Sequence, residues 1–350
     1  MAASGDYDAT KGAVEHILPL SNNRHIAYTH NGPVTSRTVV IFFHGLFSVG
    51  SAHRIPAPCQ ELGVHWIAPT LPGMGNSSTR DPSIPYHVTL AKDITALLAY
   101  LYPTDDFDTL YLLGGSFGTV PTQMLYGASY ELFPPGRKIA ASVLVAGFSP
   151  LKYHEGYAKD LSWQTWFMIG PPSRQLPCRA IQWLFRGVFG SKVKNLAGAK
   201  NFLQQNVVEK IDDEERSRLT EWLESNKLSQ DPFVEEMARG IVKCCQNWDG
   251  FMEVSDLVHS DWGFNPTELD SEHASKPILV VGSEDDEIGG GANDWLVNNY
   301  KSAKLTMFPG GHTSAVYYVD DIWREMISSE CRASFSFTIH NTNVRLVVAK

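Results

Sequence analysis

The chain has 350 residues, of which 43% are hydrophobic and 19% are charged, so it can form one large or two modest domains with an ample core. A net charge of −9 argues against unspecific binding to nucleic acid. No apolar run reaches the length of a membrane span, and residues 1–12 are small and polar, unlike a signal peptide.

The cysteines indicate an intracellular setting. There are five, an odd number without the spacing of a metal site: Cys59, Cys178, Cys244, Cys245 and Cys331. We expect reduced thiols with structural or incidental roles, in a cytoplasmic protein. The sequence indicates no metal or organic cofactor, and it does not specify an oligomeric state.

Strand-like and helix-like segments alternate over the first 150 residues. After residues 1–12, which look disordered, residues 14–20 and 25–29 are typical of an antiparallel hairpin. Buried strands are predicted at 38–43, 65–69, 110–113 and 141–146, with helical patterns at 90–101 and 120–132. This alternation predicts a doubly wound parallel sheet.

The alternation stops between residues 151 and about 270. Helices are predicted at 179–189, at 212–227 behind a capping box formed by Asp212 and Glu215, and from 231 onward with Pro232 in the first turn. Six of the nine tryptophans lie here, which favours an inserted helical cap: Trp163, Trp166, Trp183, Trp222, Trp248 and Trp262. The acidic residues of this segment look like solvated helix faces: Glu209, Asp212, Asp213, Glu214, Glu215, Glu235 and Glu236.

The sheet pattern resumes at residues 277–281 and 304–308, each followed by a helical pattern. We therefore expect an α/β protein with a mostly parallel, doubly wound, eight-stranded sheet flanked by helices. Its core spans 13–150 and 271–330, and its cap spans 151–270. The tail, 331–350, alternates apolar and polar residues like a strand, but nothing in the sequence places it in the fold.

One stretch, residues 110–119, combines a short apolar strand, a tight turn and the start of a helix. The turn reads G-x-S-x-G, with Gly114, Ser116 and Gly118. This string can arise by chance, but a strand-turn-helix is the context that a nucleophile elbow requires. A strand that turns directly into a helix leaves no room for side chains two residues before and after the corner. It also lifts the serine to a helix N-terminus, where N–H groups can hold an anion.

A serine hydroxyl needs a base within hydrogen-bonding reach, and the base needs an acid to orient it. Ser116, the acidic cluster at 282–287 and His312 each follow a predicted strand directly. The loops at the carboxyl ends of parallel strands lie on one edge of the sheet, so these three can converge.

At these residues the chain resembles the α/β-hydrolase fold family, in the branch with a helical cap after the sixth strand. The resemblance covers about 14–330 and rests on His44-Gly45, the elbow at Ser116, Gly282 with Asp285, and Gly311-His312. It implies that Ser116 is the nucleophile, that His312 is the general base, and that Asp285 orients His312.

The neighbours of Asp285 leave alternatives open. Asp286 is adjacent and can take the same role, whereas Glu284 is interpreted as a solvated neighbour. Asp256 and Asp261 are distant substitutes from the cap.

The resemblance also implies an oxyanion hole and a pocket. The Phe117 N–H is one expected donor, and Leu46, or else Phe47, is the other. His44 is expected to support their loop by hydrogen bonds. The substrate pocket is expected to be apolar, roofed by the cap, and lined by Phe47, Tyr153, Trp163, Trp166 and Phe167.

The sequence therefore predicts a serine hydrolase that cleaves a small-to-medium apolar ester through an acyl-enzyme, with no nucleic-acid partner and no membrane span. The same triad also serves proline-iminopeptidase-like enzymes, carbon–carbon and thioester hydrolases, acyltransferases and enzymes that cleave cyanohydrins. A non-catalytic ligand-binding protein on this fold is the alternative from another class.

Overall fold

The computed structural model describes residues 13–327, except 160, 287, 289 and 290, together with residues 345–347. Its centre is one nine-stranded sheet with the order β1-β2-β4-β3-β5-β6-β7-β8-β9. The strands are β1 (Glu15–Pro19), β2 (His25–Asn31), β3 (Thr38–Phe43), β4 (His65–Pro69), β5 (Thr109–Gly115), β6 (Ile139–Val145), β7 (Ile278–Ser283), β8 (Ala303–Phe308) and β9 (Arg345–Val347).

The sheet is parallel from β4 to β8 and antiparallel at both ends. Strand β2 pairs with β1 and with β4 in antiparallel fashion, and β9 pairs antiparallel with β8. The other neighbours, β4-β3-β5-β6-β7-β8, run parallel. The eight predicted strands are thus confirmed. Strand β9 adds a ninth from the C-terminal tail, which the sequence left unplaced.

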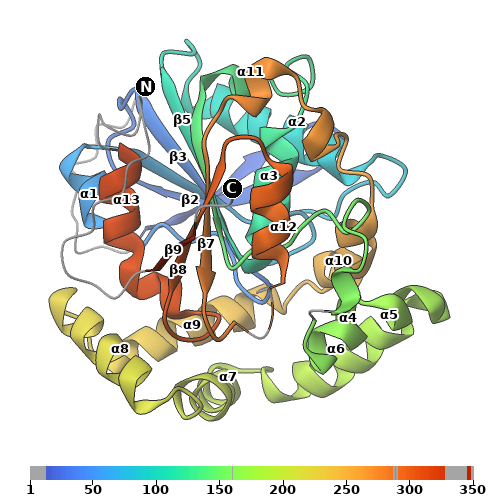
Figure 1. Cartoon of the computed structure of the whole chain (residues 1–350), viewed down its shortest axis with the longest axis vertical. Helices are drawn as coiled ribbons and strands as arrows, with labels where there is room; N and C mark the ends of the chain where they lie inside the picture. Colours follow the sequence, from blue (N-terminus) through green and yellow to red (C-terminus); the bar gives the residue numbers. More distant parts are fainter. Residues whose placement is uncertain (1–12, 160, 287, 289–290, 328–344, 348–350) are drawn as a thin grey trace.

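Helices cover both faces of this sheet (Figure 1). They are α1 (Ala57–Glu61) and α13 (Val319–Ile327) on one face, and α2 (Tyr86–Leu101), α3 (Thr119–Tyr126) and α12 (Ala292–Asn299) on the other. Helix α3 is shorter than the sequence suggested, because it ends at Tyr126 in front of Gly127.

The alternation of strand side chains explains the two faces. In β3, Val39 and Ile41 join the apolar cluster that contains the buried side of α2, whereas Val40 joins the cluster under α13. A strand buried on both faces needs apolar residues at every position, which is the pattern of residues 38–43. This burial fixes the sheet between its helix layers and so sets the position of its carboxyl edge.

The chain between β6 and β7 is helical throughout its described elements. It contains α4 (Trp163–Ile169), α5 (Pro171–Gln175), α6 (Ala180–Lys192), α7 (Leu196–Leu203), α8 (Asp213–Ser225), α9 (Gln230–Cys244), α10 (Asp249–His259) and α11 (Ser271–Ala274). Helices α4 to α8 follow one another in an arc along one end of the molecule (Figure 1). The bounds of a cap at 151–270 stay a prediction.

Local signals explain where two of these helices begin. Asp212 caps α8, since its side chain accepts a hydrogen bond from the Glu215 N–H. Asn195 caps α7 in the same way through the Gly198 N–H. Helices α6, α7 and α9 then enclose a small apolar cluster of their own, with Phe189, Leu203 and Ala238 among its buried members.

The predictions for the two chain ends fall outside the described residues, whereas the prediction about membrane spans can be compared with the described helices. Residues 1–12, expected to be disordered, lie outside the described residues, as does the alternating stretch around 335–339. Among the described residues, the helices are too short or too polar for any of them to traverse a lipid bilayer.

Candidate active site

The turn after β5 holds Ser116 in a strained backbone conformation. Strand β5 ends at Gly115, a 3₁₀ helix spans Ser116–Gly118, and α3 begins at Thr119. Ser116 has a φ of 51°, in the left-handed region that residues with a side chain rarely adopt. Such strain is typical of a nucleophile elbow, which pushes the hydroxyl out of the sheet.

The two outer glycines of the motif, Gly114 and Gly118, leave no space for a side chain. A Cβ at Gly114 would lie 2.2 Å from the Gly118 carbonyl oxygen, and a Cβ at Gly118 would lie 2.1 Å from the carbonyl oxygen of Phe43 in β3. The corner is therefore packed directly against the backbone of the neighbouring strand. Gly115 differs from both, because a Cβ there would meet nothing within 4 Å.

His312 follows β8 and joins two side chains at the carboxyl edge of the sheet. Its Nε2 lies 2.9 Å from the Ser116 Oγ, and its Nδ1 lies 2.8 Å from the Asp286 Oδ1. The Asp286 side chain is fully buried, whereas that of His312 keeps 19% of its surface exposed. Since the carboxylate can only accept, Nδ1 carries the proton and Nε2 accepts from the serine hydroxyl.

The aspartate that contacts His312 in the structure is Asp286, the alternative that the sequence left open, and not Asp285. Asp285 lies on the surface, and its backbone N–H donates to the Gly310 carbonyl at 3.1 Å. This bond ties the loop after β7 to the loop after β8, and the next residue, Asp286, turns its carboxylate inward to His312. The Ser283 and Ser314 hydroxyls, 2.9 Å apart, link the same two loops.

His44 supports the loop after β3, as expected. Its Nε2 accepts from the Leu71 N–H at 3.1 Å, so Nδ1 carries the proton and donates to the Gly45 carbonyl at 2.8 Å. Burial lowers the pKa of His44 to about 4, so it is neutral at physiological pH. Both ring nitrogens are occupied by backbone groups, one in the loop after β3 and one in the loop after β4, which leaves His44 no part in proton transfer to Ser116.

The loop that His44 supports begins against Ser116. A Cβ built on Gly45 would lie 3.3 Å from the Ser116 Cβ. Phe47 has a φ of 57°, and its ring packs among the rings of Phe185, Phe189, Trp248 and Phe251. Phe117, the other expected donor residue, is completely buried. The roles of Phe117, Leu46 and Phe47 toward a substrate stay predictions.

The aromatic residues expected to line the pocket from the cap lie largely at the surface. Trp163 is 77% exposed, Trp166 and Phe167 are also exposed, and Tyr153 is half-buried. A small cavity of about 20 Å³ lies nearby, between the segment after β6 and the loop after β7, with Phe148, Tyr157 and Ile288 in its wall. Ser116 and His312 do not line it, so the pocket residues stay predictions.

The cap contributes a residue that the sequence did not point to. Glu215, in the first turn of α8, is buried, and its Oε2 accepts from the Gly311 N–H at 3.0 Å. Its position in a capping box suggested a solvated carboxylate, which is wrong for this residue. Only the tertiary fold brings α8 against the loop that carries His312, so no local signal could have revealed the contact.

Within the part of the chain that the structure describes, no group of three or more His, Cys, Asp or Glu side chains is arranged to hold a metal ion.

Residues 40–322 match the model of the alpha/beta hydrolase family. No curated protein matches the sequence of this chain. Among solved structures, an esterase, RhEst1, from Rhodococcus sp. ECU1013 is 16% identical with a TM-score of 0.54, over 90% of this chain and 97% of that chain. A thermophilic esterase from Thermogutta terrifontis is 14% identical with a TM-score of 0.54, over 89% and 96%.

A further solved structure with this fold is the 2-hydroxy-6-oxo-6-phenylhexa-2,4-dienoate hydrolase from Rhodococcus sp. strain RHA1. It is 15% identical with a TM-score of 0.54, over 90% of this chain and 97% of that chain. At these identities the likeness concerns the fold alone. It agrees with the mostly parallel sheet and flanking helices described above.

The glycine contacts predict a difference between two neighbouring substitutions. Gly118→Ala should lower the free energy of unfolding by more than about 2 kcal/mol, because its Cβ would overlap the Phe43 carbonyl. Gly115→Ala should change it by less than about 0.5 kcal/mol, because the space there is open. Urea unfolding followed by tryptophan fluorescence measures both. Equal stability of the two variants would contradict the packing of the elbow against β3.

Proposed function

The chain belongs to the alpha/beta hydrolase family, and on that premise we propose that it is a serine hydrolase that cleaves a small-to-medium apolar ester through an acyl-enzyme on Ser116. The observation that carries the proposal is the chain of hydrogen bonds from Asp286 through His312 to Ser116. A nucleophile, a base and an orienting acid in this arrangement are the parts that acyl transfer requires.

In the first step the Ser116 Oγ attacks the carbonyl carbon of the ester while its proton moves to the His312 Nε2. The imidazolium that forms is stabilised by the Asp286 carboxylate, which also holds the ring in the tautomer that leaves Nε2 free to accept. The burial of Asp286 supports this role, because a charge pair acts more strongly where water is excluded.

The oxyanion of the tetrahedral intermediate needs N–H donors that are already in place. We assign them to Phe117, directly after the nucleophile at the start of α3, and to Leu46. Leu46 is favoured over Phe47, because the Phe47 backbone lies beside the Cys244 thiol, where it opposes the burial that raises the pKa of this thiol to about 12.

Collapse of the intermediate expels the alcohol, which takes the proton from His312, and leaves the acyl group on Ser116. A water molecule then gives its proton to His312 and attacks the acyl carbon. The second collapse returns the proton to the Ser116 Oγ and releases the acid.

The surroundings of the oxyanion loop favour an apolar substrate. Phe47 leads from that loop into a cluster of rings formed by Phe185, Phe189, Trp248 and Phe251. A site beside such a cluster favours alkyl or aryl groups over charged ones. We place Tyr153, Trp163, Trp166 and Phe167 at the entrance from the cap.

Glu215 is proposed as a positioning residue for His312. By accepting from the Gly311 N–H, it holds the residue immediately before the base, and it does so from a helix of the cap. The spacing of a nucleophile and its base must be kept to within a fraction of an ångström for efficient proton transfer.

Replacement of the nucleophile tests the proposal directly. Ser116→Ala should lower turnover of a p-nitrophenyl butyrate ester by at least about 10³-fold, because among the described residues Ser116 supplies the hydroxyl that is bonded to His312. A fluorophosphonate probe should label the native protein and not the variant. Labelling that persists in Ser116→Ala, or unchanged ester turnover, would refute a serine mechanism at this residue.

Adjacent aspartates provide a matched pair for the orienting acid. Asp286→Asn should lower kcat for the ester by about 10²- to 10⁴-fold, because the amide stabilises neither the imidazolium nor the required tautomer. Asp285→Asn, one residue away at the surface, should stay within about twofold of the native kcat. The opposite ranking in steady-state kinetics would restore Asp285 as the acid.

The role of Glu215 predicts a loss in kcat that a conservative substitution restores. Glu215→Ala should lower kcat about tenfold with little change in KM, whereas Glu215→Gln should recover most of the activity because its amide oxygen can still accept from Gly311. The control is Glu214→Ala, since Glu214 is exposed and pairs with Arg218 on the helix surface. A loss that Glu215→Gln does not rescue, or that appears mainly in KM, would contradict a positioning role.

A further inference from the structure

The segment 161–208 differs in charge from the rest of the chain. It contains three Arg, three Lys and no Asp or Glu, which is a formal charge of +6 in a chain of net charge −9. The remaining residues therefore carry −15. Such a block of one sign within an acidic protein indicates attraction to a negatively charged partner rather than a solvated surface of mixed charge.

The same segment exposes an unusual amount of apolar surface. Of the fourteen large apolar side chains exposed among the described residues, seven lie between 163 and 188, on α4, α6 and the stretch between them. They are Trp163, Trp166, Phe167, Leu176, Trp183, Leu184 and Val188. Helices α4, α5 and α6 lie together at one end of the molecule (Figure 1), so these side chains share one region. We call this region the α4–α6 face.

Helix α6 is apolar on nearly all sides. Ile181 and Phe189 are buried against the protein, while Trp183, Leu184 and Val188 point outward. A helix of this kind is normally enclosed by protein or by lipid. The outward side of α6 is apolar, but no described part of the protein packs against it.

Most cations of this segment are free to bind an external anion. Arg179 pairs with Asp256 at 2.9 Å and Lys200 with Asp231 at 2.8 Å. The other four lie farther than 4.0 Å from any carboxylate within the described residues: Arg174, Arg186, Lys192 and Lys194.

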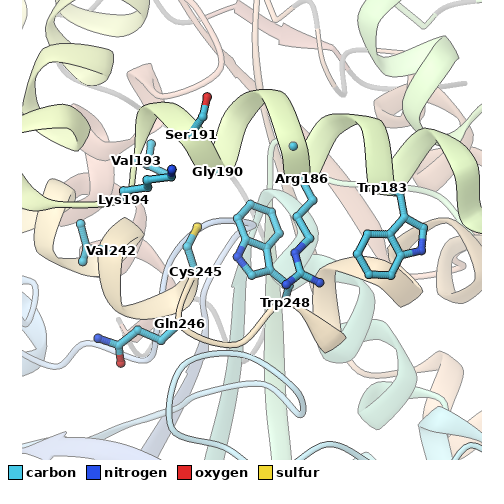
Figure 2. Close-up of a pocket in the computed structure, with 11 residues that line it drawn as sticks. Trp183, Arg186, Gly190, Ser191, Val193, Lys194, Val242, Cys245, Gln246 and Trp248 are labelled. Carbon is cyan, nitrogen blue, oxygen red and sulfur yellow. The ribbon is translucent and has the colours of Figure 1, made fainter.

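A cavity of about 580 Å³ opens at the edge of the α4–α6 face, between α6 and the chain that leads from α9 to α10 (Figure 2). Arg186 descends from α6, with its guanidinium carbon 4.9 Å from the Trp183 ring centre and 5.8 Å from that of Trp248. Lys194 also lines the cavity, and none of the described residues in its wall is acidic. A guanidinium stacked on indole rings keeps its in-plane N–H groups for a phosphate.

We propose that the α4–α6 face docks on the surface of a bilayer that contains anionic phospholipid, with a headgroup phosphate held in the cavity by Arg186 and Lys194. Tryptophan prefers the boundary between headgroups and acyl chains, and aliphatic side chains enter just below it. Nearby lysines and arginines gain from the negative potential of the lipid surface.

A second copy of the chain is a poorer occupant of this face. A two-fold interface uses the same patch on both partners, so it would place two segments of charge +6 against each other, and residues 161–208 contain no carboxylate to offset them. An anionic bilayer supplies both the apolar layer and the opposite charge. It therefore satisfies the exposed rings and the unpaired cations together.

Co-sedimentation of the full chain with lipid vesicles tests the proposal without any catalytic readout. The bound fraction should be small with vesicles of phosphatidylcholine alone and should rise about tenfold or more when part of the lipid is replaced by phosphatidylglycerol. High salt should reverse most of that increase. Equal binding to both kinds of vesicle, or binding to neither, would overturn the proposal.

Two matched pairs of variants locate the surface. Arg186→Gln with Lys194→Gln should lower binding to the anionic vesicles at least fivefold, whereas Lys92→Gln with Lys301→Gln, which removes the same charge from exposed sites elsewhere, should leave it within twofold. Leu184→Ser should weaken binding and Leu62→Ser, exposed on another helix end, should not. Far-ultraviolet circular dichroism checks that each variant is folded. A loss of equal size in test and control pairs would overturn the location.

Two further measurements address other occupants. In the first, octyl phosphate is added and tryptophan fluorescence is measured. If the fluorescence is quenched while the protein binds no vesicles, membrane docking is overturned and the cavity is assigned to a free anionic amphiphile. The second is analytical ultracentrifugation. If the native chain is a dimer, Leu184→Ser is a monomer and neither binds vesicles, the face is assigned to a second copy of the chain.

Discussion

The contact on which the site depends is the one between the turn at Ser116 and strand β3. Gly118 touches the Phe43 carbonyl, and Gly114 touches Gly118, so the turn has no freedom to relax. The backbone of Ser116 is held at a φ of 51° by this packing, and the buried sheet on both sides supplies the energy that keeps it there. Because β3 also leads into His44 and Gly45, the same contact places the loop of the proposed oxyanion donors beside the nucleophile.

Parallel strands then determine which other loops can reach Ser116. Strands β7 and β8 are neighbours, and their following loops are tied together by the Asp285 N–H to Gly310 bond and by the Ser283 and Ser314 hydroxyls. These links make the two loops one unit, in which Asp286 and His312 face each other. The unit is held from outside by Glu215 of α8. Thus a site assembled from distant parts of the sequence rests on short-range hydrogen bonds at a single edge of the sheet.

The fold and part of the candidate site could be predicted from the sequence, because local patterns specify strands and turns. Features that depend on side-chain direction or on distant contacts could not. Continuous apolar runs such as residues 38–43 mark buried strands, and G-x-S-x-G between an apolar strand and a helical pattern marks a tight turn, so the eight strands and the turn at Ser116 were predictable. Asp285 and Asp286 were not separable, because adjacent residues of a loop can point in opposite directions and spacing alone does not say which one points inward. Glu215 and strand β9 depend on contacts between segments far apart in the chain, for which the local pattern holds no signal.

The helical segment between β6 and β7 joins the two proposals physically. Its later part, α8, holds the His312 loop, and its earlier part, α4 to α6, presents exposed rings and unpaired cations. Phe47 of the oxyanion loop packs against Phe185 and Phe189 on the inner side of α6, while Arg186, next to Phe185, turns to the cavity. One helix therefore lies between the proposed lipid surface and the proposed catalytic site. To reach the proposed catalytic site, an apolar ester dissolved in a bilayer would pass this layer of aromatic side chains. An ester in water would first have to lose its hydration shell.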